Sequence, residues 1–566
     1  MAARRYWIVI AVIAAAVLGA LAVSVLRDPA PETRRAAGAS EEPFVAPQPA
    51  ALRRSVTRVA HDPTAPEPLS IVSRSHTAVV SAAHTDRLVA AQVALALGAP
   101  LVVVPARGPG DGASASEPTA EPASDGAVAD LQRLGVVRAV TVSRDDDVDA
   151  VLQRAARDGG ARDVVRLRPT GGSPPTERTV LRDAVRGDSD GDPAVDPAAL
   201  RDLEATGPPT AEPTGTAVIT RPRGASALQL AVAARAVGHT VITTVASDLR
   251  GDRVAIRQLA EMTDGPAPEV IVGTGTLARQ SRQNLALQVA VASTGMQLPG
   301  GGQLVIDPRR PHARRYITLY GVPQSPALGV LGEQSVDESV VRAREMRRRY
   351  RRAVDDGVEV VGGFEIIATV ASSSAGRDGN FANELRVAEL EPSVRAARRA
   401  GLYVLLDIQP GRSDFLTLAR RYRKLLRQPH VGLALDPEWR LAPGERHLEQ
   451  IGSVGIDEVN AVADWLAELT RRNRLPQKML LLHQFRLSMI RERAGLDTSH
   501  PELAYVVQMD GQGPQHTKLE TWAAVTANAP TRVQFGWKNF YDEDTPLRSP
   551  EATMALEPPP VFVSYQ

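Results

Sequence analysis

Hydrophobic and polar positions follow a regular pattern over the C-terminal half of the chain. Eight short apolar runs, each followed by polar residues, are separated by connections whose lengths leave room for helices. Parallel strands need crossover connections of this kind. The pattern predicts a (β/α)8 barrel over residues 312–566. The runs are Tyr316–Leu319, Val360–Ile367, Leu402–Leu406, Val431–Leu435, Met479–Leu482, Leu503–Val507, Thr531–Phe535 and Val561–Val563.

Polar residues lie in or just after the C-terminal half of most of these runs. In a (β/α)8 barrel the C-terminal ends of all strands meet on one face, where the active sites of barrel enzymes lie. We therefore expect these side chains to converge on one site. They are Glu365, Asp407, Gln409, Asp436, Glu438, Trp439, His483, Gln484, Asp510, Gln512, Trp537, Lys538 and Tyr541.

Asp436 and Glu438 are the candidates for chemistry within this set. Strand alternation places both on one face, and Trp439 beside them offers a surface on which a sugar ring could stack. Two close carboxylates raise the pKa of one of them, so that one holds a proton while the other stays ionised. Glycoside hydrolysis requires that division of roles. The alternative is that Glu438 pairs with Arg440 and only closes the end of the strand.

The remaining strand-end residues are assigned to substrate binding. Glu365 is expected deep in the barrel, where an unpaired carboxylate is costly, so Lys538 or Arg412 is its expected partner. His483 is the best-placed histidine of the barrel, and the alternative for it is a structural, hydrogen-bonded role. Residues 536–544 combine aromatic and charged side chains, as the rim of a ligand site would.

Residues 71–290 show a second pattern, in which continuous apolar runs alternate with Ala-rich stretches. Two diverged copies each give the order strand, helix, glycine turn, strand, helix, strand. Such runs are typical of a parallel sheet that is covered on both faces. We predict two small α/β modules, residues 71–205 and 206–290. In the first, Asp145–Asp147 is expected to be the first turn of a helix, where acidic side chains offset the helix dipole.

The N-terminal segment combines two arginines with an uncharged apolar stretch from Tyr6 to Leu26. About twenty apolar residues can span a bilayer, and preceding cations favour an orientation with the rest of the chain outside. Residues 1–26 are therefore predicted to be a membrane anchor, and the alternative is a cleaved signal peptide. The proline-rich residues 27–70 are predicted to be an extended linker. Both alternatives place the folded part outside the cytoplasm.

Composition narrows the classes of function. The 66 basic and 65 acidic residues balance, and no basic stripe with interleaved aromatics occurs, so a nucleic acid is not an expected partner. The lack of Cys excludes disulfides and thiolate metal sites. The sequence contains no metal-binding His pair, phosphate-binding Gly loop or Gly-x-Ser-x-Gly elbow. We therefore predict neither a metal nor a cofactor.

The first α/β module resembles a known repeat. It contains Thr77-Ala-Val-Val-Ser, then Leu97-Gly-Ala-Pro-Leu-Val-Val-Val and Leu134-Gly-Val-Val-Arg-Ala-Val. This order resembles the type 2 cell-wall-binding repeat of surface proteins in Gram-positive bacteria. Asp86 stands where that family carries Asp-Ala-Leu before the helix, whereas Gly224–Leu228 of the second module lacks the Asp. The resemblance implies that both modules attach noncovalently to an anionic cell-wall polymer.

The fourth run of the barrel carries a second resemblance. The sequence Gly432-Leu-Ala-Leu-Asp-Pro-Glu-Trp439 is similar to a reduced form of the strand-four signature of family 18 glycoside hydrolases. On that match Glu438 would be the general acid and Asp436 its partner. Ala434 occupies a position where the family carries Asp, and Met509-Asp510 corresponds to its Met-x-Tyr-Asp motif without the Tyr.

These patterns predict an envelope protein outside the cytoplasm, with modules that associate with a cell-wall polymer and a barrel that hydrolyses or binds a polysaccharide. The alternative is a non-catalytic envelope protein whose barrel only binds glycan or packs against a partner. The strand-end carboxylates favour the first function, and the incomplete family motifs favour the second. The fold alone does not decide between them.

Overall fold

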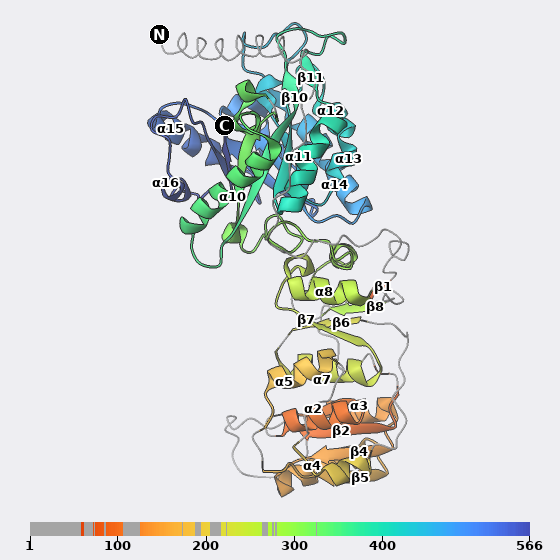
Figure 1. The fold of residues 1–566 in the computed structure, drawn as a ribbon. Helices are drawn as coiled ribbons and strands as arrows, with labels where there is room; N and C mark the ends of the chain where they lie inside the picture. Colours follow the sequence, from red (N-terminus) through yellow and green to blue (C-terminus); the bar gives the residue numbers. More distant parts are fainter. Residues whose placement is uncertain are drawn as a thin grey trace, which may run out of the picture. The chain divides into compact units, whose positions relative to one another are not determined.

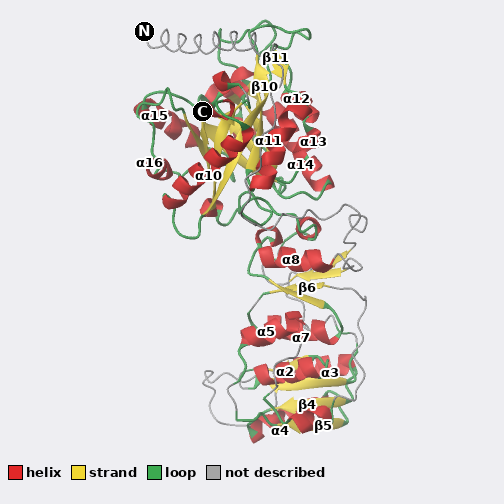
Figure 2. Ribbon diagram, in the orientation of Figure 1, coloured by secondary structure: helices red, strands yellow, loops and turns green. Residues whose placement is uncertain are grey.

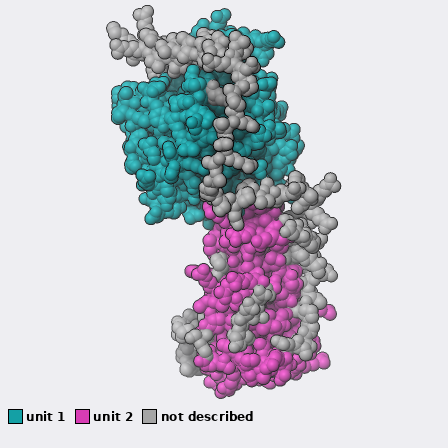
Figure 3. All heavy atoms as spheres, viewed as in Figure 1, with its two compact units in different colours: residues 1–47, 296–566 teal, residues 48–295 magenta. Residues whose placement is uncertain are grey.

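A computed structural model gives the fold. It describes residues 58–60, 69, 72, 74–83, 86–105, 125–171, 174–186, 194–203, 217–221, 223–262, 270–273, 277, 280–323 and 325–566. They fall into two compact units, one within Gln48–Gly295 and one within Met296–Gln566 (Figure 3). The predicted anchor at residues 1–26 lies outside the described residues. Across the described ranges, no helix has both the length and the apolar character needed to cross a membrane.

The second unit contains the predicted (β/α)8 barrel. Eight parallel strands form a closed ring, in which the last strand pairs with the first through Phe562 and Tyr316. Figure 1 shows strand β10 of this ring among the helices of the unit. A short strand, β11 (Ala382–Glu384), pairs antiparallel with the end of β10. The barrel strands are β9 (Arg314–Gly321), β10 (Glu359–Ala371), β12 (Tyr403–Ile408), β13 (Val431–Leu435), β15 (Lys478–His483), β17 (Leu503–Met509), β18 (Gln534–Asn539) and β19 (Phe562–Tyr565).

The seventh strand lies later in the chain than its apolar run predicts. The run begins at Thr531, whereas β18 begins at Gln534. Arg532 has a φ of 69°, a left-handed conformation that cannot continue a strand and that belongs to the preceding turn. Because of this shift, β18 extends to Asn539 and includes Lys538, a residue of the candidate site.

Helices surround the ring of strands (Figure 2). The apolar side of α14 packs into the barrel core. The connection from β15 to β17 differs from the expected pattern, since its described residues form only η8 (Leu487–Met489), η9 (Arg493–Gly495) and β16 (Ile490–Arg491), which pairs with β14 (Val454–Gly455). The other elements are η4 (Pro311–Ala313), η5 (Pro326–Leu328), η6 (Val330–Gly332), α10 (Val336–Arg352), α11 (Val387–Ala400), α12 (Phe415–Arg421), α13 (Arg423–Leu426), η7 (Pro437–Trp439), α14 (Ile456–Arg472), α15 (Gln515–Thr526) and α16 (Pro550–Met554).

The N-terminal end of the barrel is closed by a segment that precedes the predicted barrel boundary at residue 312. Leu298 and Val305 belong to a buried apolar cluster that also contains Tyr316 and Tyr403. This cluster fills the N-terminal half of the barrel interior, which is called the lower barrel below. Tyr316 Oη donates a hydrogen bond to the carbonyl of Val305 at 3.2 Å. The compact unit therefore begins at Met296.

The two predicted α/β modules form the first unit, each with a four-stranded parallel sheet in the order β3-β2-β4-β5 or β1-β8-β6-β7. Helices α2 and α7, one from each module, pack in one shared apolar cluster. Residues 58–60, within the predicted linker, form β1 of the second sheet. The elements are β1 (Arg58–Ala60), β2 (Thr77–Ala82), α2 (Arg87–Ala96), β3 (Leu101–Val104), α3 (Asp125–Leu134), β4 (Arg138–Val142), α4 (Asp146–Asp158), β5 (Asp163–Leu167), α5 (Glu177–Arg186), α6 (Pro197–Arg201), β6 (Ala217–Thr220), α7 (Ala225–Ala236), β7 (Thr240–Thr243), η2 (Leu249–Gly251), α8 (Arg253–Glu261), β8 (Val270–Gly273) and α9 (Arg282–Ala292).

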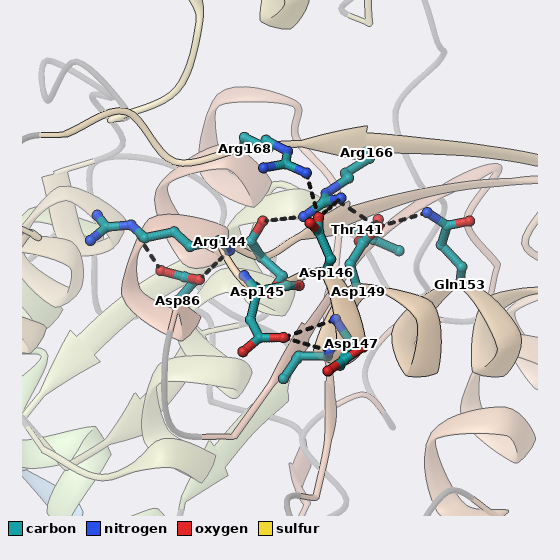
Figure 4. A network of polar contacts seen from close by, with 12 residues as sticks. Asp86, Thr141, Arg144, Asp145, Asp146, Asp147, Asp149, Gln153, Arg166 and Arg168 are labelled. Carbon is teal, nitrogen blue, oxygen red and sulfur yellow. Dashed lines mark hydrogen bonds and ion pairs between the residues drawn. The ribbon is translucent and has the colours of Figure 1, made fainter.

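The acidic turn predicted at Asp145–Asp147 begins α4 and joins a network of polar contacts (Figure 4). The Asp145 carboxylate accepts hydrogen bonds from two backbone N–H groups of the first helical turn. Asp146 pairs with Arg166 at 2.5 Å. Asp86, at the start of α2, accepts a hydrogen bond from the backbone N–H of Arg144 at 2.8 Å. Asp145 therefore caps the start of α4, and Asp86 links the segments that follow β2 and β4.

Candidate active site at the carboxyl end of the barrel

The inward-facing positions of the strands change from apolar to polar toward the carboxyl end of the barrel. Leu405 and Leu481 belong to the apolar cluster of the lower barrel. Two residues later on the same strands, alternation places Asp407 and His483 on the same inward face. Both are fully buried, as is Glu365 of β10. The strands thus hold ionisable groups directly on top of an apolar core.

His483 lies among the carboxylates of this layer. Its Nδ1 is hydrogen-bonded to Asp510 Oδ2 at 2.9 Å, and its Nε2 lies 3.0 Å from Glu365 Oε1 and 3.7 Å from Asp407 Oδ1. The contact with Glu365 is close enough for an ion pair but lacks hydrogen-bond geometry. Burial lowers the pKa of His483, but Asp407 and Asp436 outweigh burial and raise the pKa well above its ordinary value. These carboxyl groups therefore favour the imidazolium form of His483.

The partner of Glu365 is His483, and the expected pairing with Lys538 or Arg412 is wrong. Lys538 Nζ lies 3.5 Å from the centre of the Tyr320 ring, and Arg412 stacks on another aromatic ring. Strand periodicity shows which residues point inward. It does not show which of them meet across the barrel, because that depends on the stagger of the strands around the ring.

Tyr320 and Gln409 extend the network toward the solvent. Tyr320 Oη donates a hydrogen bond to Asp407 Oδ2 at 2.9 Å, and Gln409 Nε2 donates to Tyr320 Oη at 3.3 Å. Burial raises the pKa of Asp407 to about 6, although the charge of His483 opposes the rise. The hydroxyl of Tyr320 therefore fixes one oxygen of a carboxyl group that titrates just below neutral pH.

Asp436 and Glu438 are close together, but not as two positions of one strand. Strand β13 ends at Leu435, and Pro437–Trp439 form a short helical turn, because proline pre-sets the backbone for a turn and has no N–H to donate to a sheet. Burial and the charge of Glu438 raise the pKa of Asp436 well above its ordinary value. Burial and the charge of Asp510 raise the pKa of Glu438 to about 8. Glu438 therefore holds a proton at neutral pH.

A pocket of about 210 Å³ opens beside this cluster. Asp436 and His483 contribute no atoms to its wall, and neither do Glu365 and Asp407. All four are buried directly behind the residues that do. Of the predicted site residues, the pocket is lined by Gln409, Glu438, Trp439, Asp510, Gln512 and Lys538.

Three predicted site residues lie away from the pocket. The Gln484 side chain accepts a hydrogen bond from Arg493 at 2.7 Å, and the Trp537 ring packs against Trp522 with centroids 5.7 Å apart. Each is the immediate chain neighbour of an inward-facing residue, so strand alternation turns it outward. Tyr541 lies beyond the strand end, where its ring packs on another tyrosine. The sequence-based assignment of these three to the pocket is therefore corrected.

Several residues of the pocket wall were not predicted from the sequence, among them Tyr320, His447, Ile451 and Phe485. Strand alternation could have found Tyr320, because it follows the first predicted run by one residue and has the parity of the inward Tyr316. The other three lie in connections, where no strand pattern predicts the direction of a side chain.

Asp436, His483 and Asp510 each bring one potential metal-ligand atom within 4.8 Å of the others. A histidine ligand must offer a free lone pair, but His483 Nδ1 is hydrogen-bonded to Asp510 at 2.9 Å and Nε2 lies 3.0 Å from Glu365. The contacts of His483 fit a bound proton better than a metal ion.

Comparisons with known proteins assign no family. No family model and no curated protein matches the chain. A solved structure of a dinucleotide-forming acetyl-coenzyme A synthetase from Ca. Korarchaeum cryptofilum, in complex with phosphate and ADP, aligns with 82% of this chain and 88% of its own. The two chains are 12% identical and the TM-score is 0.10, a level that supports no conclusion about this protein.

Proposed function

We propose that the barrel hydrolyses a glycosidic bond with Glu438 as the proton donor. The observation that carries this proposal is that Glu438, with a pKa raised to about 8, lines the same pocket as the Asp510 carboxyl group. A general acid works best when its pKa lies near the working pH, because it is then protonated and can still release the proton. Glycosidases use a pair of carboxyl groups, one of which gives a proton to the leaving group.

The reaction divides between these two carboxyl groups. Glu438 gives its proton to the oxygen of the leaving sugar as the bond from the anomeric carbon to that oxygen breaks. A water molecule supplies the hydroxyl group that joins the anomeric carbon, and its second proton passes to Asp510. Proton exchange with solvent then restores both groups. His483 holds Asp510 in place through the 2.9 Å hydrogen bond.

The wall of the pocket supports a carbohydrate ligand. Trp439 lies on the wall, with its ring 5.3 Å from that of His447 in an edge-to-face arrangement. Such a ring can stack against the apolar face of a sugar, while Gln409 and Gln512 on the same wall can bind hydroxyl groups. Asp436 lies behind Glu438, where its charge state affects the proton that Glu438 holds.

The test is the release of reducing ends from cell-wall glycans by the purified full-length protein. Glu438→Gln keeps the shape of the side chain but removes the proton, so we expect turnover to fall by about 10² to 10⁴. Glu520→Gln is the matched control, because Glu520 is exposed on α15. Equal turnover in the wild type and Glu438→Gln would reject the role of Glu438. A protein that binds these glycans but cleaves none would support the alternative, non-catalytic function.

The α/β modules are proposed to hold the barrel at the cell wall. Their sequence resemblance to wall-binding repeats supports this proposal, as do the two parallel-sheet modules that the resemblance implies. The apolar N-terminal stretch supports a location outside the cytoplasm, with residues 1–26 as an anchor or a cleaved signal.

A further inference from the structure

The cluster behind the pocket offers more hydrogen-bond acceptors than its neighbours use. Four carboxyl groups of this cluster, in Glu365, Asp407, Asp436 and Asp510, have buried oxygens without a hydrogen-bond donor. Asp436 is 2% exposed and Asp510 is 7% exposed. A buried acceptor without a donor is costly, so these atoms favour a ligand that brings donors. The oxygens are Glu365 Oε1 and Oε2, Asp407 Oδ1, Asp436 Oδ1 and Asp510 Oδ1.

The charges of the cluster also favour a ligand that brings hydrogen-bond donors, in particular a cation. Two cations, His483 and Lys538, face a cluster of five carboxyl groups, of which Glu438 holds a proton at neutral pH. The other four are Glu365, Asp407, Asp436 and Asp510. The charge of Lys538 is partly engaged by aromatic rings, with Nζ 3.5 Å from the centre of the Tyr320 ring and 5.2 Å from that of Phe540. A ligand that carries positive charge would complete the neutralisation.

The pocket wall limits the shape of such a ligand. Trp439, Phe485 and Phe540 line it together with aliphatic side chains such as Val370 and Ile451. A wholly polar cation would leave these surfaces in contact with water. A ring with an apolar face and one cationic substituent satisfies both the wall and the carboxyl groups.

We propose that the pocket takes a glycan unit with a free, protonated amino group, and that the ammonium binds at Asp510, which lines the pocket and has an unfilled oxygen. An ammonium brings three donors and no acceptor, so it can donate to Asp510 Oδ1. An N-acetyl group brings no charge and adds a carbonyl acceptor to a site already rich in acceptors. This inference rests on the proposed function, because it specifies the substrate class of the same pocket.

The experiment measures binding of three monosaccharides to the full-length protein by titration calorimetry or ligand-observed NMR. Glucosamine, N-acetylglucosamine and glucose differ only at carbon 2, and none contains a glycosidic bond that the protein could cleave. We expect glucosamine to bind about tenfold more tightly than the other two, which is the effect of one charge-assisted hydrogen bond. Equal binding of the three sugars, or tighter binding of N-acetylglucosamine, would overturn the inference.

A pocket variant and a matched control test where the ammonium binds. Asp510→Asn removes the charge beside the amino group, so the preference for glucosamine should fall to about threefold or less, while Glu520→Gln should keep it. If Asp510→Asn does not fold, the comparison of the three sugars on the wild type decides alone. A preference that Asp510→Asn retains would place the amino group elsewhere and overturn the inference.

The binding experiment and the hydrolysis assay test different claims, so failure of one can be distinguished from failure of the other. Cleavage of N-acetylated glycans without any preference for glucosamine would leave the proposed reaction intact and reject this substrate class. A clear preference for glucosamine in a protein that cleaves no glycan would support this ligand and reject the reaction.

Discussion

At the residue scale, proton binding by buried carboxyl groups is the central property of the site. Burial raises the pKa of Asp407 to about 6 and that of Glu438 to about 8. A buried acid without a matching cation remains protonated, since charging it in a low-dielectric environment is costly. The excess of carboxyl groups over cations therefore supplies an acid at neutral pH with no need for a metal.

The raised pKa of Glu438 predicts the alkaline limb of the pH profile. The donor works only while protonated, so kcat/KM should be constant below about pH 8 and fall tenfold per pH unit above it. The measurement is the initial rate of glycan cleavage from pH 5 to 10. A rate that stays constant up to pH 10, or that rises through pH 8, would show that Glu438 is not the proton donor.

Individual residues also show what sequence reasoning can and cannot predict. Alternation from an apolar run identified Asp407 and His483 as inward-facing, because a strand has a fixed period of two. It could not identify the contact of Glu365 with His483, which spans the barrel. Trp537 was assigned to the site because of its residue type. It is the neighbour of the inward-facing Lys538 on the same strand, so strand alternation turns it outward.

At the element scale, Gly432 allows β13 to pass close to its neighbours. A Cβ atom on Gly432 would lie 2.7 Å from the Met479 carbonyl and 2.8 Å from Tyr403 Oη. The Tyr403 hydroxyl crosses this space and accepts a hydrogen bond from the Met479 backbone N–H at 3.0 Å. The missing side chain of Gly432 thus positions three consecutive strands beneath the site.

Gly432→Ala should therefore destabilise the barrel. The nearest atoms include backbone, which cannot move without displacing β15, so we expect a loss of about 1–3 kcal/mol in the free energy of unfolding, as for other overpacked cores. The measurement is urea-induced unfolding. Gly495→Ala is the control, because its Cβ would meet nothing nearer than 3.5 Å. Equal stability of the two variants would contradict this explanation of the close approach.

The sequence predicted most strands well and the connections less well. The β15–β17 connection has the length of a helical crossover, yet it folds into short turns and a two-residue strand. The segment that closes the lower barrel carries no periodic pattern, and only its buried contacts reveal its role.

At the scale of the whole molecule, the chain combines two units of different architecture. The barrel unit contains the proposed active site, and the unit within Gln48–Gly295 contains the two α/β modules. The predicted order of modules followed by a barrel could be read from the sequence, because a change in the apolar pattern separates them. The functions of the modules and of the barrel could not be read from the sequence in this way, because one fold supports many functions.

The wall-binding proposal predicts that the fragment of residues 48–295 sediments with purified Gram-positive cell walls. An electrostatic contribution to binding an anionic polymer should weaken as salt rises from about 0.01 to 1 M, because screening shortens with ionic strength. The fragment of residues 296–566 is the control and should remain mainly in the supernatant. If the first fragment also remains there at low salt, the modules are not the wall anchor.

The most direct test of the central claim compares leaving groups. A sugar leaving group needs a proton as the bond breaks, whereas a dinitrophenyl group leaves without one. Glu438→Gln should therefore lose about 10² to 10⁴ in kcat/KM on an oligosaccharide. On the matching dinitrophenyl glycoside it should retain activity within about tenfold of the wild type. An equal loss on both substrates would contradict the assignment of Glu438 as the proton donor.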